Sequence, residues 1–484
     1  FANDDVDRKT IKKQTKKLIN NMGFRSNELL CRQLDGFLNS NLSMRQNESF
    51  FARGISSGTL SAVFPFVFVS TIEPGGFSLG HNAQPVFVNF WKRSDEYVNS
   101  NMMVIGKTGS GKSYFCKSML TNLFADDAKL FVLDPENEYG NFARNLGGRV
   151  IDAGSAKEGR LNPLQIMTLL DDDGKGKVAG RASYYTHLQF LEQFFRLTLD
   201  GITPDSLEIL NNQVIKMYSE KGINENSDFD KLTPEDYPTF DDLYKIANAD
   251  MEQEQNILQK NSLQKIESYL KKFGSGGRNS HLWNGASSLK TDDTVTVFNF
   301  QTLLANKNNT TANAQMLLIL KYLDNEIIRI RDYNEAHGTN LRVVVAIDEA
   351  HVFIDPKYPV ALDFMQQLAK RIRKYNGMLI VITQNIKDFT GSEEIARKAG
   401  AVINACQYSF ILALAPQDMT DLVELYRNAG EINEIEQFDI VNNTRGKAFF
   451  IHSQTARTNI SVVTAKELRQ FFEAFSDEVN ENIE

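Results

Sequence analysis

The sequence holds little cysteine and no long apolar run. Its three cysteines, Cys31, Cys116 and Cys406, stand far apart, so they form neither a disulfide framework nor a metal-ligand pair. Isolated cysteines of this kind indicate reduced thiols in a cytoplasmic protein. The longest apolar stretch, residues 60–69, is interrupted by a serine and a proline. Because about 18 apolar residues are needed to cross a bilayer, we expect no membrane-spanning segment.

An excess of positive charge is also lacking. The formal net charge is −8, which argues against a generally basic nucleic-acid binder, although a local positive channel in a ring would not change this sum. The chain begins at Phe1, without an initiator methionine or a signal peptide, and we expect it to be the C-terminal part of a longer polypeptide. Its 484 residues exceed the usual size of a single core, so we expect either several domains or one domain with a large insertion.

The sequence does contain a glycine-rich stretch, Gly-Lys-Thr-Gly-Ser-Gly-Lys-Ser, between an apolar run and a helix-prone segment. Glycines at this spacing let the backbone bend around a polyphosphate, and the helix N-terminus adds positive potential. We expect Lys112 to reach the β- and γ-phosphates of ATP and the Ser113 hydroxyl to bind Mg²⁺. The alternative is a glycine-rich turn that matches by chance. The predicted nucleotide-binding residues are Gly106, Lys107, Thr108, Gly109, Ser110, Gly111, Lys112, Ser113 and Tyr114.

Two carboxylates follow a second apolar run, Val-Val-Val-Ala-Ile at residues 343–347. A buried parallel strand would deliver Asp348 and Glu349 at its carboxyl end, where α/β sheets place their ligands. Phosphoryl transfer needs a metal on the phosphates and a group that activates water, so we assign Asp348 to Mg²⁺ and Glu349 to the attacking water. The alternative is that both residues only cap a helix.

Other polar residues at strand ends have two interpretations. Gln384 follows the run 378–383 and either senses the γ-phosphate and positions water or satisfies loop backbone groups. Asp134 and Glu136 follow another apolar run and either contact Mg²⁺-bound water or cap a helix. His351 lies beside the carboxylates, but no second histidine or cysteine is near it in sequence, so we expect no metal site there.

Basic residues gather before the Gln384 strand. Arg371, Arg373 and Lys374 end a predicted helix, where they either complement the helix dipole or supply an arginine to a neighbouring subunit's phosphates.

Strand and helix patterns alternate on both sides of a long helical stretch. This alternation predicts an α/β fold with a mainly parallel sheet, an all-helical insertion and a short N-terminal helical and β segment. The N-terminal segment carries six lysines and arginines between residues 8 and 17 on an amphipathic pattern. We interpret it as a solvated helix face, and the alternative is a helix that contacts anionic lipid or nucleic acid. The predicted divisions are 1–48 (end of an N-terminal domain), 49–178 (first part of the core), 179–277 (helical insertion) and 278–484 (second part of the core).

The combination of motifs resembles a known family. The phosphate loop, Asp-Pro-Glu-Asn-Glu-Tyr at 134–139, Leu-Asn-Pro at 161–163, Ile-Asp-Glu-Ala-His at 347–351, the basic helix end at 371–377 and Thr383-Gln384 occur in this order. The set is similar to the conjugation and type IV secretion ATPases of the VirB or TraC/TraE type. Residues 57–59 and 64–66 and the helical stretch resemble that family too, so the likeness covers nearly the whole chain.

The resemblance implies a RecA-like P-loop NTPase core related to the FtsK and HerA translocases. It implies a hexamer that hydrolyses ATP with Mg²⁺ at the inner face of the membrane, together with other proteins of a secretion or conjugation apparatus. It also implies an arginine that acts in trans, with Arg371, Arg373, Arg445 and Arg457 as the alternatives. The Asp-Glu-Ala-His spelling at 348–351 resembles that of helicases, but the sequence shows no second RecA-like core.

Three functions remain open at this level. The first is an ATPase that powers a type IV secretion or conjugative apparatus, and the second is an FtsK/HerA-like motor with DNA in its ring. The third is a nucleotide-gated assembly scaffold with little turnover, against which the intact Glu349 argues.

Overall fold

The computed structural model describes residues 5–23, 25–28, 30–40, 71–155, 159–167, 180–229, 231–289, 293–305, 309–355, 359–390, 393–427, 430–453 and 456–472. The chain divides into two compact units, residues 1–69 and 70–484. The predicted motifs at 57–59 and 64–66 lie outside the described residues.

The first unit contains two helices, α1 (Asp5–Asn21) and α2 (Gln33–Ser40). The basic amphipathic segment forms α1, as its spacing predicts, and its lysines are exposed. No helix among the described residues of the chain combines the length and the apolar character needed to cross a membrane.

The second unit is built on one sheet of eleven strands in the order β2-β1-β11-β10-β9-β3-β8-β7-β4-β6-β5. The strands from β9 to β5 are parallel, and the strands from β2 to β10 extend the sheet in antiparallel fashion. The predicted α/β fold with a mainly parallel sheet is therefore confirmed. The strands are β1 (Phe77–Asn82), β2 (Gln84–Val88), β3 (Met102–Ile105), β4 (Lys129–Asp134), β5 (Arg149–Asp152), β6 (Val295–Asn299), β7 (Val343–Ile347), β8 (Gly377–Thr383), β9 (Tyr408–Leu412), β10 (Lys447–Ile451) and β11 (Arg457–Val462).

Successive side chains of the central strands enter two separate apolar clusters. In β3, Met103 and Ile105 belong to one cluster, whereas Met102 and Val104 belong to the other. This is the period of a strand, whose neighbouring side chains point to opposite faces of the sheet. Helices cover both faces, so the central strands β3 and β7 are apolar at every position, as buried parallel strands are.

The helices pack in two layers on this sheet. Helices α5 and α6, and Phe472 just after α19, contribute to the cluster that contains Met102, and α13 to α18 contribute to the cluster that contains Met103. These elements are α5 (Lys112–Ala125), α6 (Gly140–Asn145), α12 (Gln301–Ala305), α13 (Asn309–His337), α14 (His351–Ile354), α15 (Pro359–Arg371), η1 (Ile372–Tyr375), η2 (Lys387–Thr390), α16 (Glu393–Asn404), α17 (Asp418–Tyr426), α18 (Glu434–Asn442) and α19 (Lys466–Arg469).

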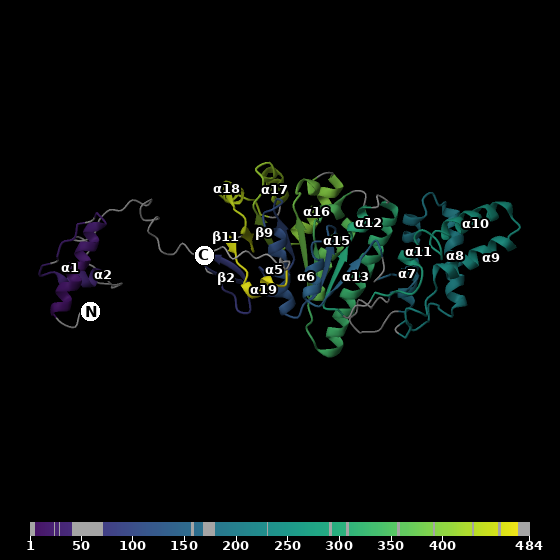
Figure 1. Cartoon of the computed structure of the whole chain (residues 1–484), viewed down its shortest axis with the longest axis horizontal. Coiled ribbons are helices and arrows are strands. Elements are labelled where there is room, and N and C mark those ends of the chain that lie inside the picture. The colour runs from purple at the N-terminus through teal and green to yellow at the C-terminus, as the bar shows by residue number, and fades with distance from the viewer. Residues whose placement is uncertain are drawn as a thin grey trace. The chain divides into compact units, whose positions relative to one another are not determined.

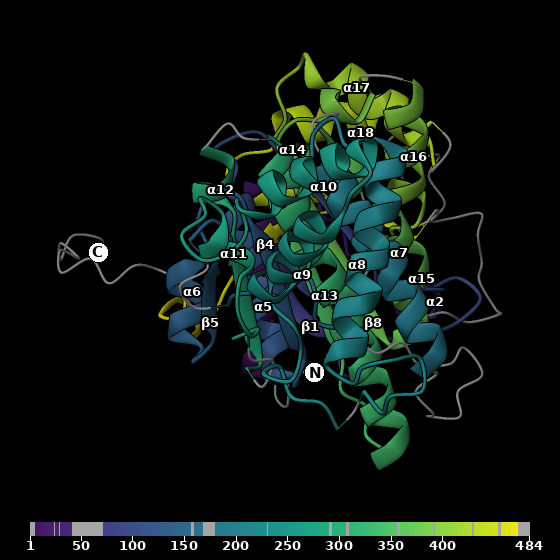
Figure 2. The ribbon, with the colours of Figure 1, turned by 90° about the vertical axis from the view of Figure 1, so that its right-hand side faces the viewer.

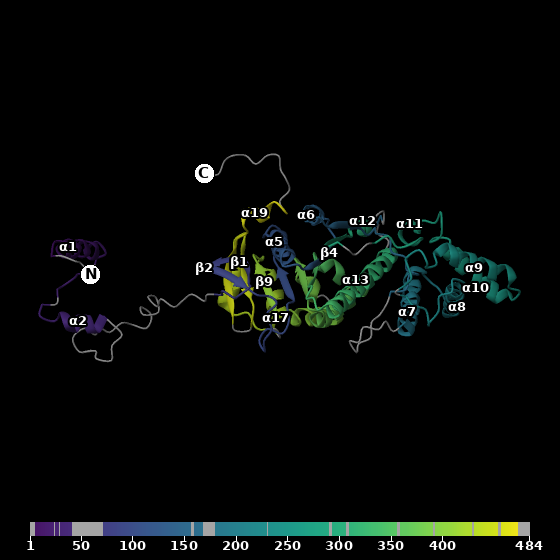
Figure 3. The same ribbon diagram turned by 90° about the horizontal axis from the view of Figure 1, so that it is seen from below.

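A group of helices lies between β5 and β6 in the chain, in the stretch where the sequence predicts a helical insertion. Figures 1 and 3 show α7 to α10 at one end of this unit and β1, β2 and β11 at the other, and Figure 2 shows the same helices in front of the core. The helices are α7 (Gly180–Thr198), α8 (Pro204–Glu220), α9 (Phe240–Gln253), α10 (Ile257–Leu270) and α11 (Ser280–Trp283).

The inserted helices are packed onto the core. Phe194 of α7 and Trp283 of α11 are fully buried in the cluster that also contains α13. The indole N–H of Trp283 donates a hydrogen bond to Gln315 of α13, with 2.7 Å between the two heavy atoms. The insertion therefore shares an apolar core with the sheet, and the domain divisions at 178 and 277 stay predictions.

Candidate nucleotide-binding and hydrolysis site

The phosphate-loop sequence lies at the carboxyl edge of the parallel sheet. It leaves the fully buried strand β3 and enters α5 through Gly111, whose φ of 101° is in the left-handed region. Gly106 has no room for a side chain, because a Cβ there would come within 2.8 Å of the Leu412 Cβ and 2.7 Å of the Ser110 Oγ. The glycines are thus required by the backbone path itself.

Unsatisfied polar groups converge on this loop. Among the described residues, the backbone N–H groups of Gly111, Lys112 and Ser113 have no recorded backbone acceptor. The buried Ser110 hydroxyl likewise has no hydrogen-bond partner within the part of the chain that the structure describes. The first N–H groups of a helix bind phosphate oxygens readily, so the loop fits a polyphosphate.

Lys112 is the first residue of α5, directly after the loop. The residue is only 7% exposed, and the structure records no ion pair for it among the described residues. A buried ammonium without an anion is unfavourable, so this position favours a negatively charged ligand.

Strand β7 brings Asp348 and Glu349 to the same edge. One strand, β8, separates β7 from β3, and the register pairs Ile347 with Val381 and Ile105 with Thr383. The Asp348 N–H donates to the Leu133 carbonyl oxygen at 3.0 Å, which extends the β7–β4 ladder. The two carboxylates and the phosphate loop therefore lie at neighbouring strand ends, as the sequence predicts.

Asp348 is strongly perturbed. Burial, and after it the charges of Glu349, Glu138 and Asp134, together raise the pKa of Asp348 to about 8. An uncompensated carboxylate in this position is costly, and a bound cation would stabilise its charged form. Oxygen ligands from a carboxylate and a hydroxyl suit Mg²⁺, so Asp348 and Ser113 fit the predicted metal.

This perturbation predicts a stability effect. The Asp348 carboxyl keeps its proton up to about pH 8 in the folded protein, whereas its usual pKa is 3.8. Between these values the folded state binds more protons, so the stability that this group contributes falls as the pH rises. We expect Asp348→Asn to raise the midpoint of thermal unfolding, in EDTA, more at pH 8 than at pH 5. The matched control is Asp95→Asn at an exposed position; an equal effect of Asp348→Asn at both pH values would contradict this account.

Gln384 contacts the phosphate loop directly. The Thr108 hydroxyl donates a hydrogen bond to the Gln384 side-chain oxygen, and the Gly106 N–H donates to the Thr383 carbonyl oxygen at 3.3 Å. The end of β8 is thus linked to the loop that would hold the phosphates. This contact favours the interpretation of Gln384 as a nucleotide-sensing side chain, which stays a prediction.

Asp134 has a structural contact that favours the capping interpretation. Its carboxylate is fully buried and accepts the backbone N–H groups of Glu138 at 3.0 Å and Tyr139 at 2.8 Å, just before α6. Glu136 is exposed in the same turn, where burial and the charge of Glu349 raise its pKa. Glu136 is therefore close enough to Glu349 to be affected by its charge, and Asp134 fixes the turn that carries Glu136.

The four arginines lie in different places. Arg371 and Arg373 precede β8, so they stand at the opposite edge of the sheet from the phosphate loop of their own chain. Arg371 donates to the Tyr375 hydroxyl at 3.0 Å, whereas Arg373 is exposed. Arg457 is paired with Glu436 at 3.0 Å. Arg445 lies beside the phosphate loop, which sequence order alone did not predict.

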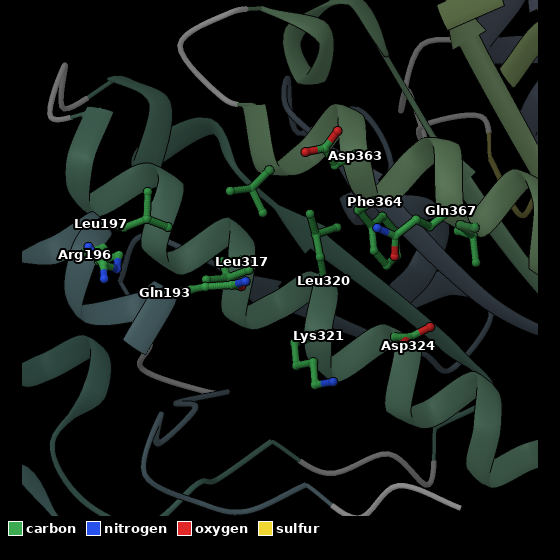
Figure 4. A pocket seen from close by; sticks show the side chains of 12 residues that line it. Gln193, Arg196, Leu197, Leu317, Leu320, Lys321, Asp324, Asp363, Phe364 and Gln367 are labelled. Atoms are coloured by element: carbon green, nitrogen blue, oxygen red, sulfur yellow. The ribbon is translucent and has the colours of Figure 1, made fainter. Parts of the chain in front are cut away.

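Two cavities differ in their relation to this edge. A cavity of about 190 Å³ adjoins the start of α5 and is lined by Gly111, Tyr114, Phe115, Leu412, Arg445, Gly446 and Val462. A larger cavity of about 490 Å³ lies between α7, α13 and α15 (Figure 4). Its carboxylates are already paired, Asp324 with Arg371 and Asp363 with Lys398, and it has no glycine-rich backbone. The smaller cavity is therefore the candidate for the nucleoside.

His351 is the residue of this edge whose contact the sequence did not reveal. Its Nδ1 lies 3.1 Å from the Glu349 Oε2. The sequence shows that His351 and Glu349 are two positions apart. Whether their side chains come into contact depends on the conformation of the turn after β7. Within the described part of the chain no group of histidines, cysteines and acidic residues has the arrangement of a metal site.

This fold and this edge define a P-loop nucleotide-binding protein. The sequence model of the TraG P-loop domain family matches residues 78–421, which is more than half of the chain. The chain therefore belongs to the TraG P-loop domain family.

Individual relatives agree with that family. The structure of VirB4 of Thermoanaerobacter pseudethanolicus aligns over 83% of this chain and 100% of its own, with 29% identity and a TM-score of 0.67. The protein TraC of Escherichia coli (strain K12) is 21% identical over 375 residues, which are 76% of this chain. The uncharacterized protein aq_aa31 of Aquifex aeolicus is 44% identical over 50 residues, or 10% of this chain and 18% of its own length. The resemblance to the VirB and TraC/TraE type of conjugation and type IV secretion ATPase is thus confirmed, although the chain spans only 39% of the length of TraC.

Proposed function

We propose that this chain is a Mg²⁺-dependent ATP hydrolase that powers a type IV secretion or conjugative apparatus. The observation that carries the proposal is the meeting of three strand ends at one sheet edge. They present the phosphate loop with Lys112, the carboxylates Asp348 and Glu349, and the amide of Gln384. These are the parts that phosphoryl transfer to water requires.

Each residue has a distinct part in the reaction. Lys112 and the N–H groups at the start of α5 compensate the charge of the β- and γ-phosphates. Glu349 accepts the proton of the attacking water while the new bond to the γ-phosphorus forms and the bond to the β,γ-bridging oxygen breaks, which releases ADP and phosphate. Ser113 and Asp348 would hold Mg²⁺, which neutralises charge on the phosphate oxygens when it is bound.

The nucleoside would occupy the cavity at the start of α5. Tyr114 and Arg445 line this cavity together with the backbone of Gly111 and Gly446. An aromatic ring and a guanidinium are surfaces on which a base stacks. The phosphate loop would fix where the nucleoside begins, and this cavity adjoins the loop at Gly111.

The wider role rests on the family. The relatives include VirB4 and TraC, and we infer that this chain works as a homo-oligomer, a hexamer, with other proteins of such an apparatus at the inner face of the membrane. The DNA-translocating alternative remains distinct. Hydrolysis of ATP should be measured with and without DNA, alongside the oligomeric state: strong stimulation by DNA would favour the FtsK/HerA-like motor over an apparatus ATPase.

The arginine of the site is expected to come from a neighbouring subunit. Arg373 is exposed and precedes β8, a strand of seven residues, so it stands about 20 Å from the phosphate loop of its own chain. Arg371 is less suited because it contacts Asp324 and Tyr375 within its chain. An arginine beside the γ-phosphate adds about 10³ to 10⁵ in rate.

Mixing two inactive variants tests this arrangement. Lys112→Ala and Arg373→Ala chains, each inactive alone, should regain partial ATPase activity together, because some interfaces combine an intact phosphate loop with an intact Arg373. The matched control mixes Lys112→Ala with Glu349→Gln, whose defects lie in the same site, and no activity should return. Full activity of a dilute monomer would contradict the arrangement in trans.

A further inference from the structure

The turn after β7 holds Glu349 and His351 together. Glu349 has a φ of 41°, in the left-handed region that a glutamate rarely adopts. The Val352 N–H donates to the Glu349 carbonyl oxygen at 2.9 Å, and the Ala350 N–H donates to the Ile382 carbonyl oxygen of β8 at 2.8 Å. Backbone bonds on both sides of Ala350 therefore fix where the two side chains begin.

The two side chains meet in a largely enclosed place. The His351 Nδ1 and the Glu349 Oε2 are 3.1 Å apart, with side-chain exposures of 23% and 9%. Neither atom has a hydrogen-bond partner of good alignment among the described residues. The contact is therefore held by charge at ion-pair distance, and a small rotation would align it. Catalytic contacts commonly tighten in this way when substrate binds.

We propose that His351 is a positioning residue for hydrolysis, which holds the Glu349 carboxylate in the orientation that activates water. The inference rests on the proposed function, since it assigns Glu349 to the attacking water. His351 itself touches no reacting atom. It acts through Glu349, because a carboxylate on a flexible side chain loses catalytic efficiency when its orientation is free.

The charges around His351 favour this part. The contact with Glu349 raises the pKa of His351 above its usual value and outweighs the lowering by burial, and the charges of Asp388 of η2 and Glu136 of the turn after β4 add smaller increases. Asp388 is itself bound by the Asn385 side chain at 2.7 Å. These carboxylates therefore favour the protonated imidazole, whose positive charge attracts the Glu349 carboxylate.

Steady-state kinetics of His351→Ala and His351→Gln test the inference. We expect His351→Ala to lower kcat for ATP about tenfold or more, with KM and the binding of a fluorescent ATP analogue changed less than about twofold. His351→Gln should restore part of kcat, because its amide N–H can reach the same oxygen. The wild-type kcat should fall as the pH rises through the raised pKa of His351, and this limb should be missing in His351→Gln.

The matched control is His337→Ala, which changes an exposed histidine at the end of α13 and should leave kcat unchanged. If the wild type is active and His351→Ala has the same kcat, the inference is wrong. A loss in both variants that comes with a lowered unfolding midpoint and an altered KM would also overturn it, in favour of a structural part. If His351→Ala does not fold, the pH profile of His351→Gln decides. An inactive wild type would instead overturn the proposed function.

Discussion

Lys112→Ala is expected to lower ATP hydrolysis by at least about two orders of magnitude. Lys112 is 7% exposed at the start of α5, and the alanine variant would leave the β- and γ-phosphates without this cation. Because the ammonium contacts charge that grows in the transition state, kcat should fall together with affinity. The measurement is phosphate release at saturating ATP and Mg²⁺, with nucleotide binding followed in parallel.

The matched control for this substitution is Lys260→Ala, at an exposed position of α10 in the inserted helices. It removes the same side chain from a place remote from the phosphate loop and should leave turnover unchanged. Wild-type turnover in Lys112→Ala would refute the assignment of the phosphate loop, whatever the control shows.

Glu349→Gln should separate binding from chemistry. Glutamine keeps the shape of the side chain but cannot accept the proton of the attacking water, so we expect hydrolysis to fall about 10² to 10⁴-fold. The phosphate and metal contacts of Lys112, Ser113 and Asp348 remain. Binding of ATP should therefore persist, and the variant should accumulate in the nucleotide-bound form. Equilibrium binding and single-turnover hydrolysis measure the two effects.

The control for this variant is Glu335→Gln, at an exposed position of α13. Glu349 has a positive φ in the turn after β7. An equal loss of binding and turnover in Glu349→Gln would mean that Glu349 stabilises this turn and does not activate water.

The parts of the site that follow local rules could be predicted from sequence. The phosphate loop needs glycine where the backbone has a positive φ or no room for a Cβ, as at Gly111 and Gly106. Asp348 and Glu349 follow a strand that is apolar at every position, which is typical of a buried parallel strand. Since parallel strands end at a common edge of the sheet, the sequence was enough to predict that Asp348 and Glu349 lie near the phosphate loop.

The parts that depend on pairing between distant segments could not be predicted. Arg445 lies beside the phosphate loop because β10 pairs with β9, and β9 pairs with β3. No local pattern specifies these partners. For the same reason, the sequence did not predict the antiparallel extension of the sheet by β1, β2, β10 and β11.

Side-chain contacts at turns were also beyond the sequence. Asp134 and Glu136 follow the same strand, but only the turn geometry shows that two backbone N–H groups bind Asp134. His351 reaches Glu349 because the chain reverses sharply between them. In both cases the sequence shows the residue types, but only the backbone conformation of the turn shows which groups they contact.

The most direct test of the central claim is phosphate release from ATP by the purified wild-type chain, measured with MgCl₂ and with EDTA in its place. The account predicts sustained, multiple-turnover release that requires Mg²⁺ and is absent from a Lys112→Ala preparation purified in the same way. Release that does not depend on Mg²⁺, or that is equal in the Lys112→Ala preparation, would contradict it. Tight binding of ATP with no release above the blank would also contradict it.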